Sequence, residues 1–289
     1  MPPRIVGMTP TFVLVHGSNS NSRAWTHLQR ELAFLGHRSL AVDLPGHGQS
    51  SGLTAAYQAP QDLEAFAAAP SAMAGVIYAD GVAHVIDVVR RVREHGPVIL
   101  VGASRGGLVL TGVGNAVPEL LDRIVYIAAL CCVDRTVLEY MQEPEYATSA
   151  IFDIPTDFVN QPTESGVVRT NWRSAGPEVL AVLKRAFLAD GTDEQVLGML
   201  NGFEPDEIPD FGTELVDKDT WGRVPHSYLR LTRDQAMPPA VQDLMIGQAD
   251  ALTPDNPFDV HSLDCSHGAS ASPGRAGEVA AILAGTLGN

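Results

Sequence analysis

Ser104 stands at the centre of the pentapeptide 102–106 (GASRG), directly after the apolar run 98–101 and before a helix-like stretch. A strand that turns sharply into a helix exposes its central side chain on a strained backbone, and only very small residues fit two positions before and after it. Gly102 and Gly106 satisfy that requirement. This pattern predicts that Ser104 is a nucleophile.

The chain also supplies an imidazole and a carboxylate in the order that such a serine needs. A serine hydroxyl attacks well only when an imidazole takes its proton and a carboxylate orients that imidazole. His267 follows the last predicted strand, with only a terminal helix after it. Asp234 follows the predicted strand 228–231, at the carboxyl end of the sheet. We predict a triad of Ser104, Asp234 and His267, with Asp134 as the alternative acid.

The other polar residues near strand ends receive structural roles. Asp264 is expected to cap or solvate its own loop. The histidines other than His267 are expected to be surface or packing residues. Among them, His16 is expected to brace the loop after the first strand through hydrogen bonds.

Attack on a carbonyl creates an oxyanion, which preorganised N–H donors stabilise by about 3 to 4 kcal/mol each. The N–H of Arg105, directly after the nucleophile, is one expected donor. The N–H of Ser18 is the second, and Gly17 lets that loop approach the substrate closely. The side chain of Arg105 has two alternative roles, an ion pair with a carboxylate of the segment 134–223 or recognition of a polar substrate group.

Short apolar runs alternate with longer amphipathic stretches, which predicts a parallel sheet covered by helices on both faces. The expected strands are 11–15, 38–42, 98–101, 124–129, 228–231 and 260–263. The expected helices are 23–35, 79–94, 106–117, 239–248 and 274–287. The fold class is therefore α/β, a doubly wound, mainly parallel sheet of about six strands.

This alternation stops between residues 134 and 223, where acidic, proline-containing and short helical pieces follow one another. We expect a core formed by 1–133 and 224–289 and an inserted, mostly helical cap formed by 134–223. Its aromatic residues Tyr140, Trp172 and Phe203 are candidates for substrate binding, against the alternative of ordinary packing under an acidic shell. The irregular segment 50–74 is expected to be a surface excursion without chemistry.

Composition excludes several classes of function. The chain has 289 residues and a formal charge of −15, which argues against nucleic acid or an anionic membrane as a partner. Its three cysteines make no disulfide framework, and no spacing of Cys and His resembles a zinc site. We expect no metal and no cofactor.

The N-terminus lacks the apolar core of a secretion signal, and no later run reaches about 18 apolar residues. A cytoplasmic location is the expectation. The residue usage is typical of a protein encoded in a GC-rich bacterial genome. The sequence is compatible with a homodimer.

Taken together, these motifs resemble the α/β-hydrolase superfamily, in the branch that holds plant methylesterases, plant hydroxynitrile lyases and bacterial esterases of the pyrethroid-hydrolase type. The resemblance covers nearly the whole chain. It rests on 12–17 (FVLVHG), 41–48 (AVDLPGHG), the pentapeptide around Ser104, 232–234 (TRD) and 266–267 (SH). It implies the same triad of Ser104, Asp234 and His267.

Two departures within that branch bear on the reaction. Its cyanohydrin-cleaving lyases carry a threonine after the first-strand histidine and a lysine after the catalytic histidine, whereas this chain has Gly17 and Gly268. The resemblance therefore favours hydrolysis. The chain also departs from the plant esterases in its longer segment 50–74, its Arg105 and its polar loop 18–22.

The leading hypothesis is a serine hydrolase of a carboxylic ester or lactone, acting through an acyl-serine intermediate on a small-to-medium apolar substrate. The first alternative is a lyase, cyclase or acyl-transfer enzyme of secondary metabolism on the same scaffold. The second is a non-catalytic ligand-binding protein, since a fold does not prove a function.

Overall fold

The main sheet of the protein is parallel throughout. The computed structural model describes residues 9–159, 161–163, 166–268 and 272–288. Within these ranges six strands pair in the order β2-β1-β3-β4-β8-β9. They are β1 (Thr11–Val15), β2 (Arg38–Ala41), β3 (Val98–Ser104), β4 (Arg123–Ala129), β8 (His226–Leu231) and β9 (Asp259–Leu263). The predicted doubly wound α/β sheet is confirmed.

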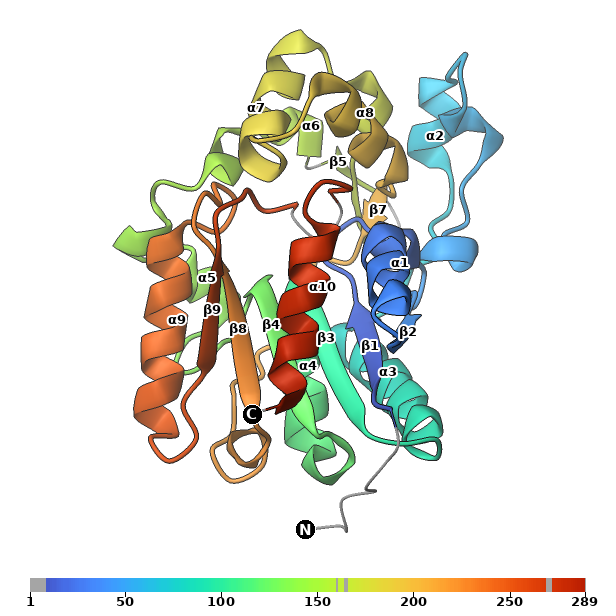
Figure 1. Cartoon of the computed structure of the whole chain (residues 1–289). Coiled ribbons are helices and arrows are strands. Elements are labelled where there is room, and N and C mark those ends of the chain that lie inside the picture. The colour runs from blue at the N-terminus through green and yellow to red at the C-terminus, as the bar shows by residue number, and fades with distance from the viewer. Residues whose placement is uncertain (1–8, 160, 164–165, 269–271, 289) are drawn as a thin grey trace.

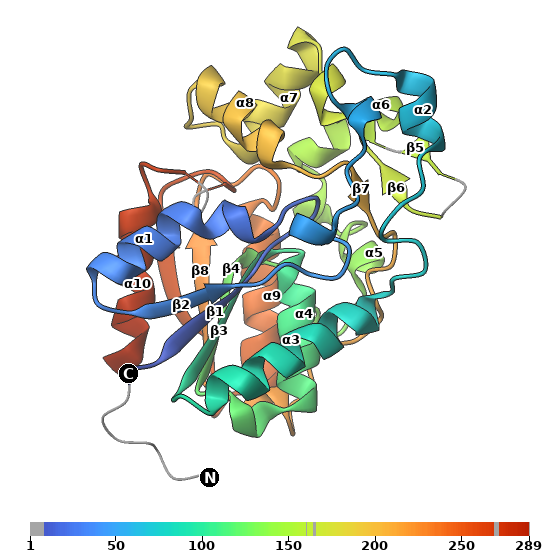
Figure 2. The same cartoon turned by 90° about the vertical axis from the view of Figure 1, so that its right-hand side faces the viewer.

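Helices cover both faces of this sheet (Figures 1 and 2). On one face lie α1 (Thr26–Phe34) and α10 (Ala276–Gly285), and on the other α3 (Tyr78–Arg93), α4 (Gly106–Ala116) and α9 (Pro239–Leu252). Successive side chains of a strand point to opposite faces. Phe12 and Leu14 accordingly join the core under α1 and α10, whereas Val13 and Val15 join the core under α3 and α4.

The element boundaries differ from the predicted ones in small and explicable ways. The helix expected from residue 23 begins as a 3-10 turn (Ser22–Trp25) and becomes α-helical at Thr26. The third strand continues to Ser104, since Ser104 still pairs with Ala129 of β4 across a register shift. The strand therefore carries the nucleophile candidate on its last residue.

The strand order reverses between β1 and β3. From β1 the chain moves outward to β2, and then returns to place β3 on the other side of β1. Ligands of open α/β sheets bind at the carboxyl ends of strands beside such a reversal. Val15 of β1 pairs with Gly102 of β3, so the loop after β1 and the turn after β3 meet there.

The segment between β4 and β8 lies over the carboxyl ends of the main strands (Figure 1). Its described elements are α5 (Val137–Tyr140), α6 (Thr156–Val159), α7 (Pro177–Phe187), α8 (Asp193–Gly202) and a small antiparallel sheet of β5 (Gln161–Pro162), β6 (Val168–Arg169) and β7 (Asp206–Glu207). Trp172, Leu183, Val196 and Leu200 form an apolar cluster of its own. The segment thus packs partly on itself.

The segment 50–74, expected as a surface excursion, joins the segment between β4 and β8 over the strand ends, and we call the two together the upper layer. It contains α2 (Leu63–Ala68), which lies beside the small sheet in Figure 2. The buried Arg169 of β6 donates from Nη1 to the carbonyl oxygens of Phe66 (2.7 Å) and Ala69 (2.9 Å). Arg173 donates to the carbonyl oxygen of Tyr57 at 3.0 Å. The upper layer therefore consists of two segments that are distant in the sequence.

The packing at the end of β3 predicts a large effect of adding one methyl group. A Cβ at Gly106 would lie 2.7 Å from the carbonyl oxygen of His16 and 2.8 Å from that of Val15. Because both atoms belong to the backbone at the end of β1 and cannot move aside as a side chain can, Gly106→Ala should destabilise the protein by about 2 to 3 kcal/mol. The midpoint of urea denaturation measures this. Gly247→Ala, on the exposed face of α9 with no atom within 4 Å of the added Cβ, is the matched control and should be stabilising. Equal stability of the two variants would contradict the argument.

Candidate active site

Ser104 lies on the strained turn that a nucleophile elbow requires. Its φ angle is +55°, a left-handed conformation between β3 and α4. A Cβ at Gly102 would lie 2.6 Å from Leu110 Cδ1, and one at Gly107 would lie 2.3 Å from the carbonyl oxygen of Leu130. The glycines therefore let α4 pack closely against the sheet immediately after the turn.

His267 and Asp234 are held together by a short hydrogen bond. His267 Nδ1 donates to Asp234 Oδ2 at 2.6 Å, while Asp234 Oδ1 accepts the N–H groups of Ala236 and Met237, each at 2.8 Å. The Asp234 side chain is fully buried. Burial alone lowers the pKa of His267, but the charge of Asp234 and its hydrogen bond raise that pKa above its usual value. This arrangement fixes the tautomer and leaves Nε2 as the basic nitrogen.

The two other carboxylates considered for this role lie elsewhere. Asp134, the alternative acid, is half exposed and pairs with its neighbour Arg135 at 2.8 Å. Asp264 accepts a hydrogen bond from Thr232 Oγ1 at 2.9 Å, across the loops that follow β8 and β9. Asp234 is the carboxylate that the structure brings to His267.

The loop after β1 lies directly against Ser104. A Cβ at Gly17 would be 2.9 Å from Ser104 Cβ and 3.5 Å from Ser104 Oγ. Only a glycine therefore leaves the backbone at residue 17 open toward the hydroxyl. Ser18, the predicted second oxyanion donor, follows Gly17 in the chain and is exposed. The roles of Gly17, Ser18 and the Arg105 N–H stay predictions.

His16 is a bracing residue in this loop. Its Nδ1 donates to the carbonyl oxygen of Gly17 (2.9 Å), and its Nε2 accepts the N–H of Leu44 (3.1 Å). Burial, together with the neighbouring His47, lowers the pKa of His16 to about 4. The ring is therefore neutral and links the loop after β1 to the chain after β2.

The Arg105 side chain is enclosed by the upper layer. It donates from Nη1 to the carbonyl oxygen of Ile208 (2.9 Å) and from Nη2 to that of Asp210 (2.5 Å). Its guanidinium lies 4.3 Å from the ring centre of Phe211 and 3.8 Å from Glu207 Oε1. Of the two alternatives that the sequence leaves open, these contacts correspond to the ion pair with a carboxylate of 134–223.

Sequence reasoning missed two buried carboxylates that reach the core from above. Glu204 Oε1 accepts Asn21 Nδ2 (2.9 Å) and the N–H of Gly48 (2.7 Å). Glu207 Oε2 accepts the N–H of Asn19 (2.8 Å) and lies 3.5 Å from His47 Nε2. The acidic shell was one alternative for the segment 134–223 as a whole, and neither residue was singled out within it. The only signal for these carboxylates in the sequence was Arg105, an unusual residue at the position after Ser104, because a buried arginine needs a carboxylate partner.

The three aromatic candidates occupy different places. Tyr140 is fully buried and its hydroxyl donates to Gln248 Oε1. Trp172 is buried, donates from Nε1 to the carbonyl oxygen of Glu204 (2.9 Å) and packs edge-on against Phe203. Phe203 in turn contacts Phe187, whose ring centre is 6.1 Å from that of His267.

The upper layer also bonds to the loop that carries His267. The N–H of Gly268 donates to the carbonyl oxygen of Phe187 at 2.8 Å. Ser266 donates from its hydroxyl to Asp190, the first polar residue after α7. The loop is therefore held by the upper layer on both sides of the imidazole.

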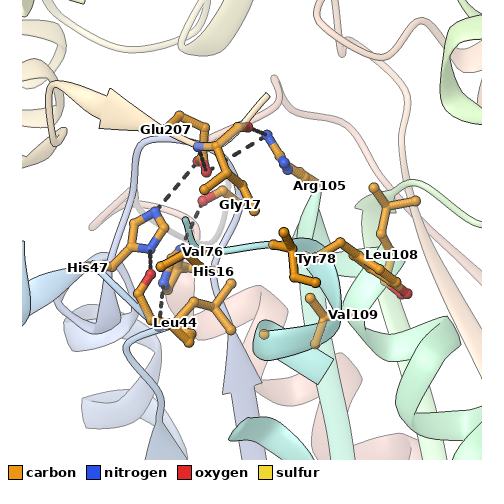
Figure 3. A pocket seen from close by; sticks show the side chains of 15 residues that line it. His16, Gly17, Leu44, His47, Val76, Tyr78, Arg105, Leu108, Val109 and Glu207 are labelled. Atoms are coloured by element: carbon orange, nitrogen blue, oxygen red, sulfur yellow. Dashed lines mark hydrogen bonds and ion pairs between the residues drawn. The ribbon is translucent and has the colours of Figure 1, made fainter. Parts of the chain in front are cut away.

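A cavity of about 40 Å³ lies beside the expected oxyanion loop. Figure 3 shows His47, Arg105 and Glu207 over the apolar side chains of Leu44 and Val109. Gly17 also lines this cavity, whereas Ser104 and His267 do not. The cavity is therefore adjacent to the candidate nucleophile and does not enclose it.

The residues that the structure describes form neither a metal site nor a membrane-spanning helix. They hold no group of three or more His, Cys, Asp or Glu side chains that could ligate a metal ion. Cys131, Cys132 and Cys265 are buried free thiols. Among the described residues, every helix is too short or too polar to span a bilayer. The first eight residues, on which the predicted lack of a secretion signal rests, lie outside the described ranges.

Solved structures share the overall arrangement. A pyrethroid hydrolase from Sphingobium faniae superposes with a TM-score of 0.68 at 22% identity, covering 96% of this chain and 98% of that one. A methylesterase from Arabidopsis superposes with a TM-score of 0.65 at 20% identity, covering 97% and 99% of the two chains. At identities this low, the superpositions establish a common fold and nothing beyond it.

Sequence comparison points in the same direction. An uncharacterised Mycobacterium bovis protein is 31% identical over 126 residues, which are 44% of this chain and 31% of that protein. The chain thus matches about a third of the length of such curated relatives. The family model described as "Alpha/beta hydrolase family" matches residues 12–282. The chain belongs to the alpha/beta hydrolase family.

Proposed function

We propose that this protein is a serine hydrolase that cleaves a carboxylic ester or lactone through an acyl-serine intermediate. The observation that carries the proposal is Ser104 on a left-handed turn, with the backbone of Gly17 open against its hydroxyl. The hydrogen-bonded pair of His267 and Asp234 supplies a base of fixed tautomer. Nucleophile, oxyanion donors and base are the parts that acyl transfer needs.

In the proposed reaction, His267 Nε2 takes the proton of Ser104 Oγ as the oxygen attacks the ester carbonyl carbon. The N–H groups of Arg105 and Ser18 stabilise the resulting oxyanion. The C–O bond to the alcohol then breaks, and protonated His267 gives its proton to the leaving oxygen. A water molecule, deprotonated by His267, then attacks the acyl carbon. The C–O bond to Ser104 Oγ breaks, His267 returns the proton to that oxygen, and the acid leaves. Asp234 stabilises the imidazolium in both steps.

We infer that 134–223 acts as a cap over a core of 1–133 and 224–289, and that the substrate is small to medium in size and apolar. The ring of Phe187 lies close to His267 and packs against Phe203, and Met199 lies 3.9 Å from the position of a Cβ on Gly268. Apolar walls with few polar groups suit a substrate of that character. Solved relatives with this fold are named as hydrolases of pyrethroids and as methylesterases, which supports an ester.

Cyanohydrin cleavage is the less favoured reaction. The lyases that the chain resembles carry a lysine where this chain has Gly268. A Cβ at residue 268 would lie 2.9 Å from the carbonyl oxygen of Phe187, whose hydrogen bond holds the loop. A lysine there would require the upper layer to shift.

Removal of the nucleophile or the base is expected to abolish ester hydrolysis. With a series of chromogenic esters of increasing acyl length, Ser104→Ala and His267→Ala should each lower kcat/KM by at least about a thousandfold. The acyl length with the highest rate then measures the space beside Ser104. His84→Ala, at an exposed position on α3, is the control and should keep wild-type rates. A folded wild-type protein that turns over neither these esters nor a series of lactones would refute the proposal.

The pH dependence of the reaction should report the coupling of His267 to Asp234. His267 acts only when its Nε2 is unprotonated, and Asp234 raises the pKa of His267 above 6.5. The value of kcat/KM should therefore fall on the acid side with an apparent pKa above 6.5. Asp234→Asn removes the charge, so the midpoint should move to lower pH while kcat falls by about 10⁴. A midpoint that stays unchanged in Asp234→Asn would mean that another group titrates.

A further inference from the structure

The carboxylate of Glu207 contacts a residue of each of the two chain segments that carry the expected oxyanion donors. Glu207 lies on β7 of the upper layer and is buried. Its Oε2 accepts the N–H of Asn19, next to Ser18, at 2.8 Å. Its Oε1 accepts its own neighbour's N–H, that of Ile208, at 3.0 Å and lies 3.8 Å from the guanidinium of Arg105, the residue after Ser104. Figure 3 shows the Glu207 side chain between His47 and Arg105.

We propose that Glu207 is a positioning residue that presets the oxyanion hole by fixing the loop of Ser18 and Asn19 relative to the turn at Ser104 and Arg105. This inference rests on the proposed serine hydrolysis. It assigns to the upper layer a task beyond enclosing the substrate. Oxyanion donors stabilise a transition state because they are held in place before the charge develops.

The loop needs such an external partner because its backbone is strained. Asn19 has a φ angle of +52°, in the left-handed region. Besides the bond to Glu207, its carbonyl oxygen accepts the N–H of Glu204 at 2.7 Å, and its Nδ2 donates to the carbonyl oxygen of Glu204 at 3.0 Å. All three bonds run to the segment 204–207. The conformation of Asn19 is therefore set from the upper layer.

A carboxylate fits this position and an amide does not. Oε2 faces the N–H of Asn19 and His47 Nε2, and Oε1 faces the N–H of Ile208 and the Arg105 guanidinium. In either orientation a glutamine places its NH₂ group against a backbone donor, the N–H of Asn19 or that of Ile208. Burial raises the pKa of Glu207, but contacts with His47, Arg105 and Asn19 lower it to about 2, so the group is ionised. The ion is thus compensated on both sides.

Asp206, the preceding residue on β7, offers a matched control. It is as buried as Glu207 and is also paired with an arginine, since Arg169 donates to its two oxygens at 2.6 and 2.7 Å. That pair faces α2, as Arg169 also bonds to the carbonyl oxygen of Phe66. Asp206→Asn and Glu207→Gln therefore each remove one buried charge from the same short strand.

The test compares these two variants in the full chain. Glu207→Gln should lower kcat about 10- to 100-fold with KM within about threefold, because the donors are displaced and the substrate surface is unchanged. Its affinity for a trifluoromethyl ketone, which mimics the tetrahedral intermediate, should fall by the same factor as kcat/KM. Asp206→Asn should keep kcat and the ketone affinity within about twofold of wild type, even if its Tm falls as much as that of Glu207→Gln. Glu207→Asp, which keeps the charge, should lie between wild type and Glu207→Gln.

Amide hydrogen exchange of the segment 16–20 provides a readout that needs no substrate. It should quicken in Glu207→Gln and stay at the wild-type rate in Asp206→Asn. Wild-type kcat and ketone affinity in Glu207→Gln, or equal losses in the two variants, would overturn the positioning role. If wild type hydrolyses no ester, the proposed function fails separately, and the exchange rates alone then decide whether Glu207 holds this loop.

Discussion

Close approach of backbone to backbone at the end of β3 is the constraint on which the rest of the structure depends. The left-handed turn at Ser104 exists because glycines at 102, 106 and 107 leave no side chain between α4 and the sheet. The same approach brings Gly17 against Ser104, so the proposed nucleophile and the proposed oxyanion loop become neighbours through a single packing arrangement. Strain of this kind persists only where the surroundings hold it. Two extensive apolar cores, one on each face of the sheet, supply that hold.

The interface between sheet and upper layer follows a different principle, because it is polar and buried. In place of water, the buried carboxylates of Glu204 and Glu207 contact backbone N–H groups and the side chains of Asn21, Arg105 and His47. Such groups stabilise little in total, since desolvation offsets most of the attraction, but they penalise every arrangement that leaves one of them unpaired. An apolar contact would permit sliding. The polar contact specifies one position of the upper layer relative to Ser104.

Features set by residues close together in the sequence could be predicted, and most of those set by distant residues could not. All six main strands and the helices between them follow from local periodicity and turn residues, and the Ser104 turn follows from glycines within two positions of it. The pairing of His267 with Asp234 follows from strand-end positions, which parallel sheets bring together. The two-residue strands β5 to β7 carry too little pattern to be recognised. The docking of α2 on Arg169 and the partners of Glu207 depend on tertiary contacts that leave no periodic trace.

The bonds between the first-strand loop and the segment 204–207 also have a consequence for the order of folding. Asn19 and Glu207 are separated by 188 positions, and Asn19 and Glu204 by 185. Contacts of such high sequence separation form late, since the entropy of closing the loop must be overcome before they contribute. During synthesis the N-terminal part of a chain emerges first. The loop beside Ser104 is thus synthesised well before its partners and is among the last parts to become ordered, so the proposed oxyanion donors take their positions only once the upper layer has docked.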